Sequence, residues 1–273
     1  MSQTLDEVKP LVDATLGRLA KRKFREDPLL GADYSRRTSI AASAQRRHGH
    51  IIEAAFRCRL NQVPHFDVWE TDAFAVSAVA DSMVNAEKDR LNLLKATVQY
   101  GDLNRRLQVD ALVYDQERRT LASYELKRGG DRHDAGKTRS MFRDLLCTQV
   151  LLKSYGESLG FKVDAARAYI VFYYGRGSIP KPFALTRDDL NGHFGVDLRG
   201  AIEEVNEYFR VQLMELVAEK AEPKAMVPID AEVNDADAAE MDDGNVAEDS
   251  AVVQDTADLE LLADAEGIPK PSA

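Results

Sequence analysis

This chain of 273 residues has few cysteines and no long apolar run. Its two cysteines, Cys58 and Cys147, do not have the spacing of metal ligands, which excludes a disulfide scaffold and a cysteine-rich zinc site. No run of about 18 apolar residues is present, so we expect neither a membrane span nor a membrane partner. The first six residues lack a basic segment followed by an apolar stretch, so we expect no secretory signal. These absences favour a reducing, cytoplasmic setting.

Two common catalytic patterns are also missing. Ser39, Ser43 and the two cysteines lack the flanking residues of a nucleophilic hydrolase. Residues 175–178 contain two glycines, but they do not have the spacing of a phosphate-binding P-loop. A serine or cysteine hydrolase and a P-loop enzyme are therefore unsupported.

Acidic charge is concentrated toward the C-terminal end. Residues 222–273 hold 15 acidic residues against Lys224 and Lys270, whereas residues 1–221 hold 34 basic and 31 acidic residues. The net charge is thus −13 for this tail and +3 for the body. The tail has no aromatic residue and too little apolar surface to offset the entropy of ordering it, so we predict a disordered acidic tail. It could solubilise the chain, cover a basic cleft as an autoinhibitory segment, or bind a partner.

Helical and strand patterns alternate along the body. Apolar spacing predicts helices over residues 4–24, 38–60, 80–97, 135–155 and 197–219. Runs rich in β-branched and aromatic residues predict strands within residues 66–78, 107–114, 120–127 and 167–174. This order predicts an α/β fold with a three-layer α/β/α core around a mixed β-sheet. We divide the chain into an N-terminal helical extension (1–37), a main domain (38–221) and the acidic tail (222–273).

The two strands at residues 107–114 and 120–127 are typical of a hairpin, and they carry charged residues. Asp110 lies near the start of the first strand. Glu125 and Lys127 lie near the end of the second strand, on one face, because strand side chains alternate between faces. Charges on an inner sheet face are costly to bury unless they bind something. Paired carboxylates suit Mg²⁺ or Mn²⁺, and such an ion can activate water and neutralise charge on a phosphate.

The spacing of Asp110, Glu125 and Lys127 resembles the motif of the PD-(D/E)XK nuclease superfamily, which has the restriction-endonuclease-like fold. The resemblance covers roughly residues 38–175. Val109 stands where the motif has proline, a position that the family varies freely. The resemblance implies that Asp110, Glu125 and the main-chain carbonyl of Leu126 hold the metal ion, and that Lys127 acts on the attacking water.

The helix predicted over residues 38–60 carries a polar stripe. Arg46, His50, Glu53 and Arg57 share one face, and apolar residues cover the other. The resemblance implies that Glu53 joins the metal site, and His50 could contact metal, water or phosphate. His48 is expected to be a partly exposed helix residue without a role.

Cations around the predicted site are expected to contact nucleic acid. Gln149 is included because it is similar to a glutamine of some exonuclease-like branches, although Lys153 stands where those branches have tyrosine. The full set of expected nucleic-acid contacts is Arg46, His50, Arg128, Arg132, Lys137, Arg139 and Gln149.

The function that these residues favour is a divalent-metal-dependent nuclease acting on DNA. Restriction, repair, recombination and phage defence are not distinguished, and a homodimer would suit double-strand cutting. The alternative is a catalytically inactive nucleic-acid-binding or scaffold protein on the same fold. A third interpretation is an interaction protein whose acidic tail is the functional part.

Overall fold

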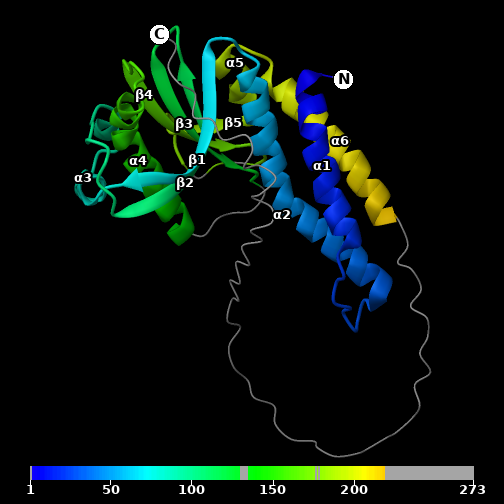
Figure 1. The fold of residues 1–273 in the computed structure, drawn as a ribbon. Helices are drawn as coiled ribbons and strands as arrows, with labels where there is room; N and C mark the ends of the chain where they lie inside the picture. Colours follow the sequence, from blue (N-terminus) through cyan, green and yellow to red (C-terminus); the bar gives the residue numbers. More distant parts are fainter. Residues whose placement is uncertain (1, 130–134, 176, 178, 219–273) are drawn as a thin grey trace, which may run out of the picture. The chain divides into compact units, whose positions relative to one another are not determined.

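The computed structural model of this protein describes residues 2–129, 135–175, 177 and 179–218. They form an α/β fold around a mixed five-stranded sheet with the strand order β1-β2-β3-β4-β5 (Figure 1). The strands are β1 (Phe66–Val76), β2 (Arg105–Asp115), β3 (Thr120–Lys127), β4 (Ala165–Phe172) and β5 (Ala184–Thr186). The first three strands pair antiparallel, whereas β3, β4 and β5 pair parallel.

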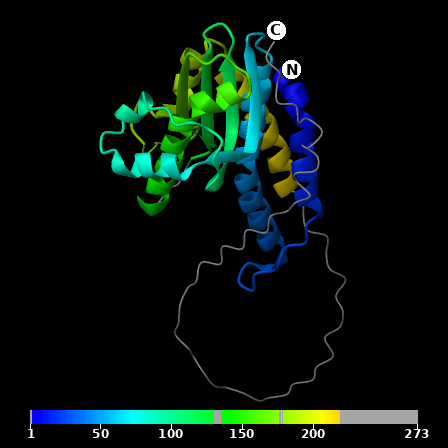
Figure 2. The same cartoon turned by 60° about the vertical axis from the view of Figure 1, so that its left-hand side comes forward.

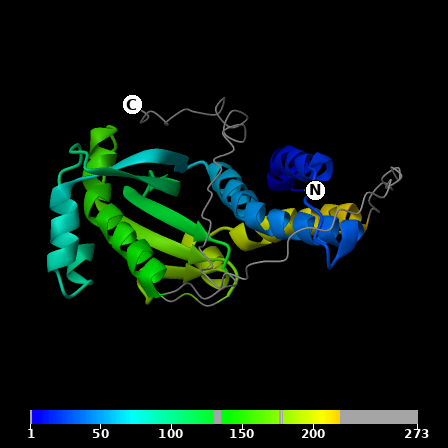
Figure 3. The same ribbon diagram turned by 90° about the horizontal axis from the view of Figure 1, so that it is seen from below.

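Helices cover both faces of this sheet. The α-helices are α1 (Gln3–Lys21), α2 (Gly31–Asn61), α3 (Ala78–Ala86), α4 (Ala135–Ser158), α5 (Leu190–Phe194) and α6 (Leu198–Ala218). Two short 3-10 helices complete the fold, η1 (Asn92–Leu94) and η2 (Arg187–Asp189). Figures 2 and 3 show α4 on one side of the sheet and α2 and α6 on the other. The predicted α/β class with a mixed sheet is thus confirmed.

The alternation of side chains along β2 explains the three layers. Ala111 and Val113 belong to the apolar core shared with α1, α2 and α6, whereas Leu112 and Tyr114 belong to the core shared with α3 and α4. Each face of the strand therefore packs against its own apolar core, and residues 111–114 are continuously apolar in sequence.

The start of α2 was predicted wrongly, because the helix begins at Gly31 and not near residue 38. Thr38 lies within the helix. Its hydroxyl donates to the carbonyl of Tyr34 (2.8 Å) inside the helix, and an ion pair one turn apart joins Arg37 to Asp33 (3.0 Å). The predicted division at residue 37 falls within this helix.

The helix predicted over residues 80–97 is also wrong in length. Ser77 caps its N-terminus, since its hydroxyl accepts from the amide of Ala80 (3.2 Å), but α3 ends at Ala86. Beyond that point the guanidinium of Arg90 donates to the carbonyl of Glu87 (2.7 Å), which satisfies a group that a longer helix would have used. The short elements β5 and α5 were not predicted.

The remaining body elements are confirmed to within a few residues, including the hairpin strands and the long helix that follows them. The predicted acidic tail lies outside the described residues. Within the part of the chain that the structure describes, no helix has both the length and the apolar character needed to cross a membrane.

Candidate functional site

Asp110 lies in the middle of β2, further from its start than predicted, and beside the end of β3. Ala111 pairs with Tyr124, so Asp110 comes beside Glu125 one residue further along the two strands. The register of β2 against β1 shifts between Val109 and Leu112, which is the mark of a β-bulge. Such an irregularity can redirect a side chain, and the Asp110 carboxylate accepts a hydrogen bond from the amide of Leu126 (2.7 Å).

Asp110 is buried among other charges, with 7% of its surface exposed. Burial raises the pKa of Asp110 to about 7, and the negative charges of Glu125 and Glu53 act in the same direction. The ammonium of Lys127 and the amide of Leu126 oppose this rise in pKa without cancelling it. The carboxylates of Glu125 and Glu53 therefore lie close enough to Asp110 for their charges to disfavour its ionisation.

Lys127 supplies the positive charge of this cluster. Burial lowers the pKa of Lys127, but the charges of Glu125, Asp110 and Glu53 outweigh burial and hold that pKa above its usual value. Its Nζ forms an ion pair with Glu125. Lys127 is consequently a fixed cation beside the paired carboxylates.

The helix α2 brings the third carboxylate to this end of the sheet. The side chain of Glu53 is only 13% exposed, and its Oε2 lies 3.1 Å from Nδ1 of the exposed His50. One turn later, Arg57 donates to the main-chain carbonyl of Asp110 (2.7 Å) and pairs with Glu70 of β1 (2.7 Å). Arg57 thus joins α2 to the strands that carry the site.

The donor set fits a hard divalent cation in its chemistry, since it consists of carboxylate oxygens and a main-chain carbonyl. The raised pKa of Asp110 marks negative charge that nearby cations leave uncompensated. However, no three acidic, histidine or cysteine side chains in residues 2–218, gaps excepted, are grouped closely enough to hold a metal ion. The carboxylates converge, but they do not form a coordination shell in this conformation, in which Glu125 is paired with Lys127.

His48 was wrongly expected to be partly exposed, because it is buried between α2 and α6. Its Nε2 lies 3.0 Å from Oδ1 of Asn206, and its Nδ1 accepts a hydrogen bond from Nε of Arg128 (3.2 Å). Only the neutral imidazole with its proton on Nε2 satisfies both partners. Burial lowers the pKa of His48 to about 4, and the charge of Arg128 adds to this effect.

This network fixes the side chain of Arg128, the residue that directly follows Lys127. Asn206 also donates to the hydroxyl of Tyr174 (2.9 Å), and the guanidinium of Arg128 lies 5.5 Å from the centre of the Tyr174 ring. Sequence reasoning could not find His48 as the partner, since the two residues are 80 positions apart and no local motif links them.

The other residues expected to contact nucleic acid differ in their exposure. Arg46, Lys137 and Arg139 are exposed on α2 and α4, whereas Arg132 lies outside the described residues. Gln149 is 3% exposed, and its amide group accepts from the amide of Ala168 (2.9 Å) and donates to the carbonyl of Ala166 (3.2 Å). Its position against β4 argues against a contact with nucleic acid.

A small cavity of about 80 Å³ lies beside Glu125, between β2, β3 and α4. Gln108, Ser123, Asp144 and Thr148 supply its polar lining. Glu125 therefore has open space beside it on the α4 side of the sheet.

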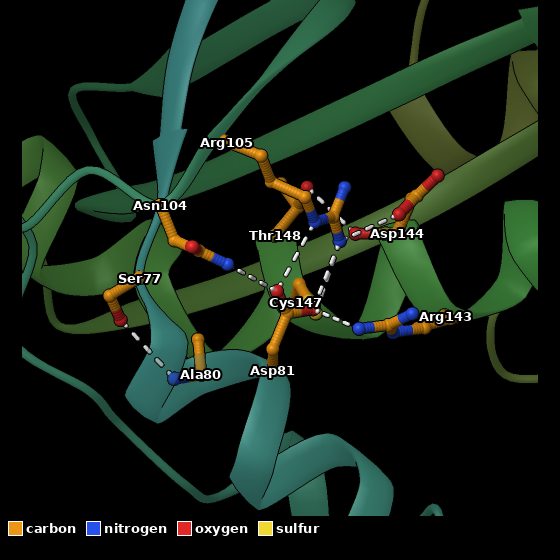
Figure 4. Close-up of polar contacts among 9 residues, drawn as sticks. All are labelled: Ser77, Ala80, Asp81, Asn104, Arg105, Arg143, Asp144, Cys147 and Thr148. Atoms are coloured by element: carbon orange, nitrogen blue, oxygen red, sulfur yellow. Dashed lines mark hydrogen bonds and ion pairs between the residues drawn. The ribbon is translucent and has the colours of Figure 1, made fainter.

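A second buried carboxylate, Asp81 of α3, has quite different neighbours (Figure 4). Its Oδ1 accepts from Arg105 (3.1 Å), from Arg143 (2.8 Å) and from the thiol of Cys147 (3.4 Å). The hydrogen bond from Arg105 is the main reason that the pKa of Asp81 falls to about 2. This cluster holds α3 against α4 and β2.

No family model, no curated protein and no solved structure matches this chain. Inference about its function therefore depends on the chemistry of its own residues.

Proposed function

We propose that this protein is a divalent-metal-dependent nuclease of the PD-(D/E)XK type that hydrolyses phosphodiester bonds of DNA. The observation that carries the proposal is the buried Asp110, whose pKa is raised to about 7 by burial and by the carboxylates of Glu125 and Glu53. The order of the elements also supports the proposal, because the resemblance implies helices in this order around the hairpin: α2, β1, β2, β3, α4, β4.

The residues of the cluster would divide the chemistry among them. Asp110, Glu125, Glu53 and the main-chain carbonyl of Leu126 would hold Mg²⁺ or Mn²⁺. When bound, such an ion lowers the pKa of a coordinated water and neutralises charge on the phosphate. Lys127 would orient the attacking water and stabilise the negative charge that the phosphate gains, since its raised pKa keeps it cationic.

The substrate would be held by cations around this cluster. Arg128 is positioned beside Lys127 by His48, and Arg46, Lys137 and Arg139 present exposed charge on the neighbouring helices. Contacts of this kind to phosphates give affinity without sequence preference. A cytoplasmic setting, and a homodimer where both strands are cut, belong to the same proposal.

A cleavage assay tests the proposal directly. The full chain with Mg²⁺ or Mn²⁺ is given plasmid, linear and single-stranded DNA, beside the variants Lys127→Ala and Asp110→Asn. Lys162→Ala, an exposed lysine before the start of β4, is the matched control. We expect cleavage by the parent and the control only. Equal cleavage by Lys127→Ala, or none by the parent with any of the substrates, would contradict the proposal.

A second candidate is a nucleic-acid-binding or scaffold protein without catalysis. It is favoured by one observation, which is that the described residues contain no three-ligand cluster ready to hold a metal ion. In that case the parent and both variants would bind DNA without cutting it.

A further inference from the structure

A larger pocket lies at the opposite end of the sheet from Asp110. Its volume is about 310 Å³, and it is lined where β2 ends and where β3 and β4 begin, with α5 forming one wall. Lys127 lies at the other end of β3, and Asp110 lies beside that end from the middle of β2. The pocket therefore belongs to neither the carboxylate cluster nor its cavity.

Five aromatic rings line the pocket, those of Phe66, Tyr124, Tyr169, His193 and Phe194. The rings of Tyr124 and Tyr169 are stacked, with centroids 5.5 Å apart and an interplanar angle of 16°. His193 stands edge-on to Tyr169 at 5.0 Å, and Phe194 lies 5.2 Å from Tyr124. A planar ring is the ligand shape that such a set of faces and edges accommodates best.

Two of these rings also carry polar groups, the hydroxyl of Tyr124 and the ring nitrogens of His193. The hydroxyl of Tyr124 is hydrogen-bonded to Nε2 of His193 (2.8 Å), and burial lowers the pKa of that imidazole, so it is neutral. Nδ1 of His193 has no hydrogen-bond partner among the described residues. It can therefore bond to a heteroatom at the edge of a planar ligand.

Positive charge lies at the pocket mouth. Arg118 and Arg167 both line the pocket and are exposed. The Arg118 side chain is 73% exposed with only a loose pairing to Asp115 (3.7 Å), whereas Nη1 of Arg167 donates to the main-chain carbonyls of Leu94 (3.1 Å) and Ala166 (2.9 Å). Guanidinium groups present several donors in a planar fork, which suits the oxygens of a phosphate.

We propose that this pocket binds a mononucleotide, with its base against Tyr169 and His193 and its phosphate against Arg118 and Arg167. The size of the pocket favours a single nucleotide unit, because ligand pockets span about 300–1,000 Å³ and this one is at the lower limit. The site is separate from the proposed nuclease cluster and does not depend on it.

The test is calorimetric titration of the full chain with the four 5′-mononucleotides, without added divalent metal. Matching nucleosides and inorganic phosphate are the reference probes. Arg118→Ala and Tyr169→Leu are the test variants, and Arg210→Ala, an exposed arginine of α6, is the charge-matched control. Thermal melting checks that each variant is folded. Arg118→Ala keeps the test valid if Tyr169→Leu does not fold.

We expect at least one mononucleotide to bind, and its nucleoside to bind about tenfold more weakly because the phosphate contact is missing. Arg118→Ala should weaken binding several-fold, and Tyr169→Leu more strongly, while Arg210→Ala and Asp110→Asn should bind as the parent does. The proposal is overturned if no mononucleotide binds, if phosphate alone binds equally well, or if Asp110→Asn abolishes binding.

Discussion

Asp81 and Asp110 are equally buried, each with 7% of its surface exposed, yet their pKa values move in opposite directions. Guanidinium groups surround Asp81, and its pKa falls to about 2. Carboxylates surround Asp110, and its pKa rises to about 7. Burial is the main cause that raises the pKa of Asp110, and the neighbouring carboxylates add to it. At Asp81 the hydrogen bonds and charges of the guanidinium groups outweigh burial.

The charges around each carboxylate decide what each cluster can do. The Asp81 cluster satisfies its own charges and joins α3 to α4, which is a structural role. The Asp110 cluster has more negative charge than Lys127 alone can offset, so the addition of a cation would stabilise it. Perturbed groups of this second kind are the ones that cluster at functional sites.

The largest expected effect is on activity, from Asp110→Asn. The substitution removes one carboxylate from the cluster, and we expect cleavage to fall by about 10²–10³-fold or more, as when one electrostatic group leaves an active site. Stability should be unchanged or higher, because a like charge is removed. Single-turnover cleavage and thermal melting measure the two effects. A loss of stability as large as that of Asp81→Asn would remove the contrast between the two residues.

The same substitution at Asp81 should act in the opposite way. Asp81→Asn leaves Arg105 and Arg143 without their buried counter-charge, and we expect a loss of about 2 kcal/mol in the free energy of unfolding. Asp144→Asn is the control, since the Asp144 side chain is 35% exposed and its one ion pair among the described residues is with Arg105, so it should cost about 0.5 kcal/mol. Urea denaturation measures both values, and equal losses would contradict the prediction.

His48 extends the comparison to a buried base. Its pKa is about 4 in the fold and about 6.5 when unfolded, so the neutral form stabilises the folded state. This contribution is fully present above about pH 6.5 and is lost as the pH falls through about 4. We expect His48→Gln to reduce the fall in unfolding free energy between neutral pH and about pH 5, while the surface variant His65→Gln keeps it. An unchanged pH slope in His48→Gln would argue against a neutral His48.

The smallest expected effect is on the affinity of the protein for DNA, and it should differ between two arginines of α4. Both arginines are exposed, but Arg143 is paired with Asp81 (2.8 Å), and Arg139 lies one turn earlier. Arg139→Ala should lower the slope of log affinity against log salt by about 0.9, the value for one phosphate contact, and Arg143→Ala should lower it less. Fluorescence anisotropy over a range of salt concentrations measures the slopes. A larger change with Arg143→Ala would reverse the assignment.

Local patterns explain which elements could be predicted from the sequence. The hairpin strands are apolar and β-branched and are joined by a short polar connection, so their positions followed from neighbouring residues. The start of α2 did not, because its first turns are polar and depend on pairs such as Arg37 with Asp33. The strand β5 has three residues, too few to show any period.

The same limit applies to the candidate site. Asp110 and Glu125 are joined by one hairpin, so their proximity could be anticipated from spacing alone. Asn206 is 158 positions from His48, and only the packing of α6 on α2 brings the two together. A buried network built from distant elements has no signature in a single sequence.

The side-chain amide of Gln149 bonds to the main chain at the outer side of β4. Because β5 pairs with β4 only at residues 170–172, the outer side of β4 before Ile170 has no neighbouring strand among the described residues. Gln149 occupies one donor and one acceptor there, so that stretch is less open to a strand from another molecule. We therefore expect Gln149 to hinder the addition of a further strand at this sheet edge.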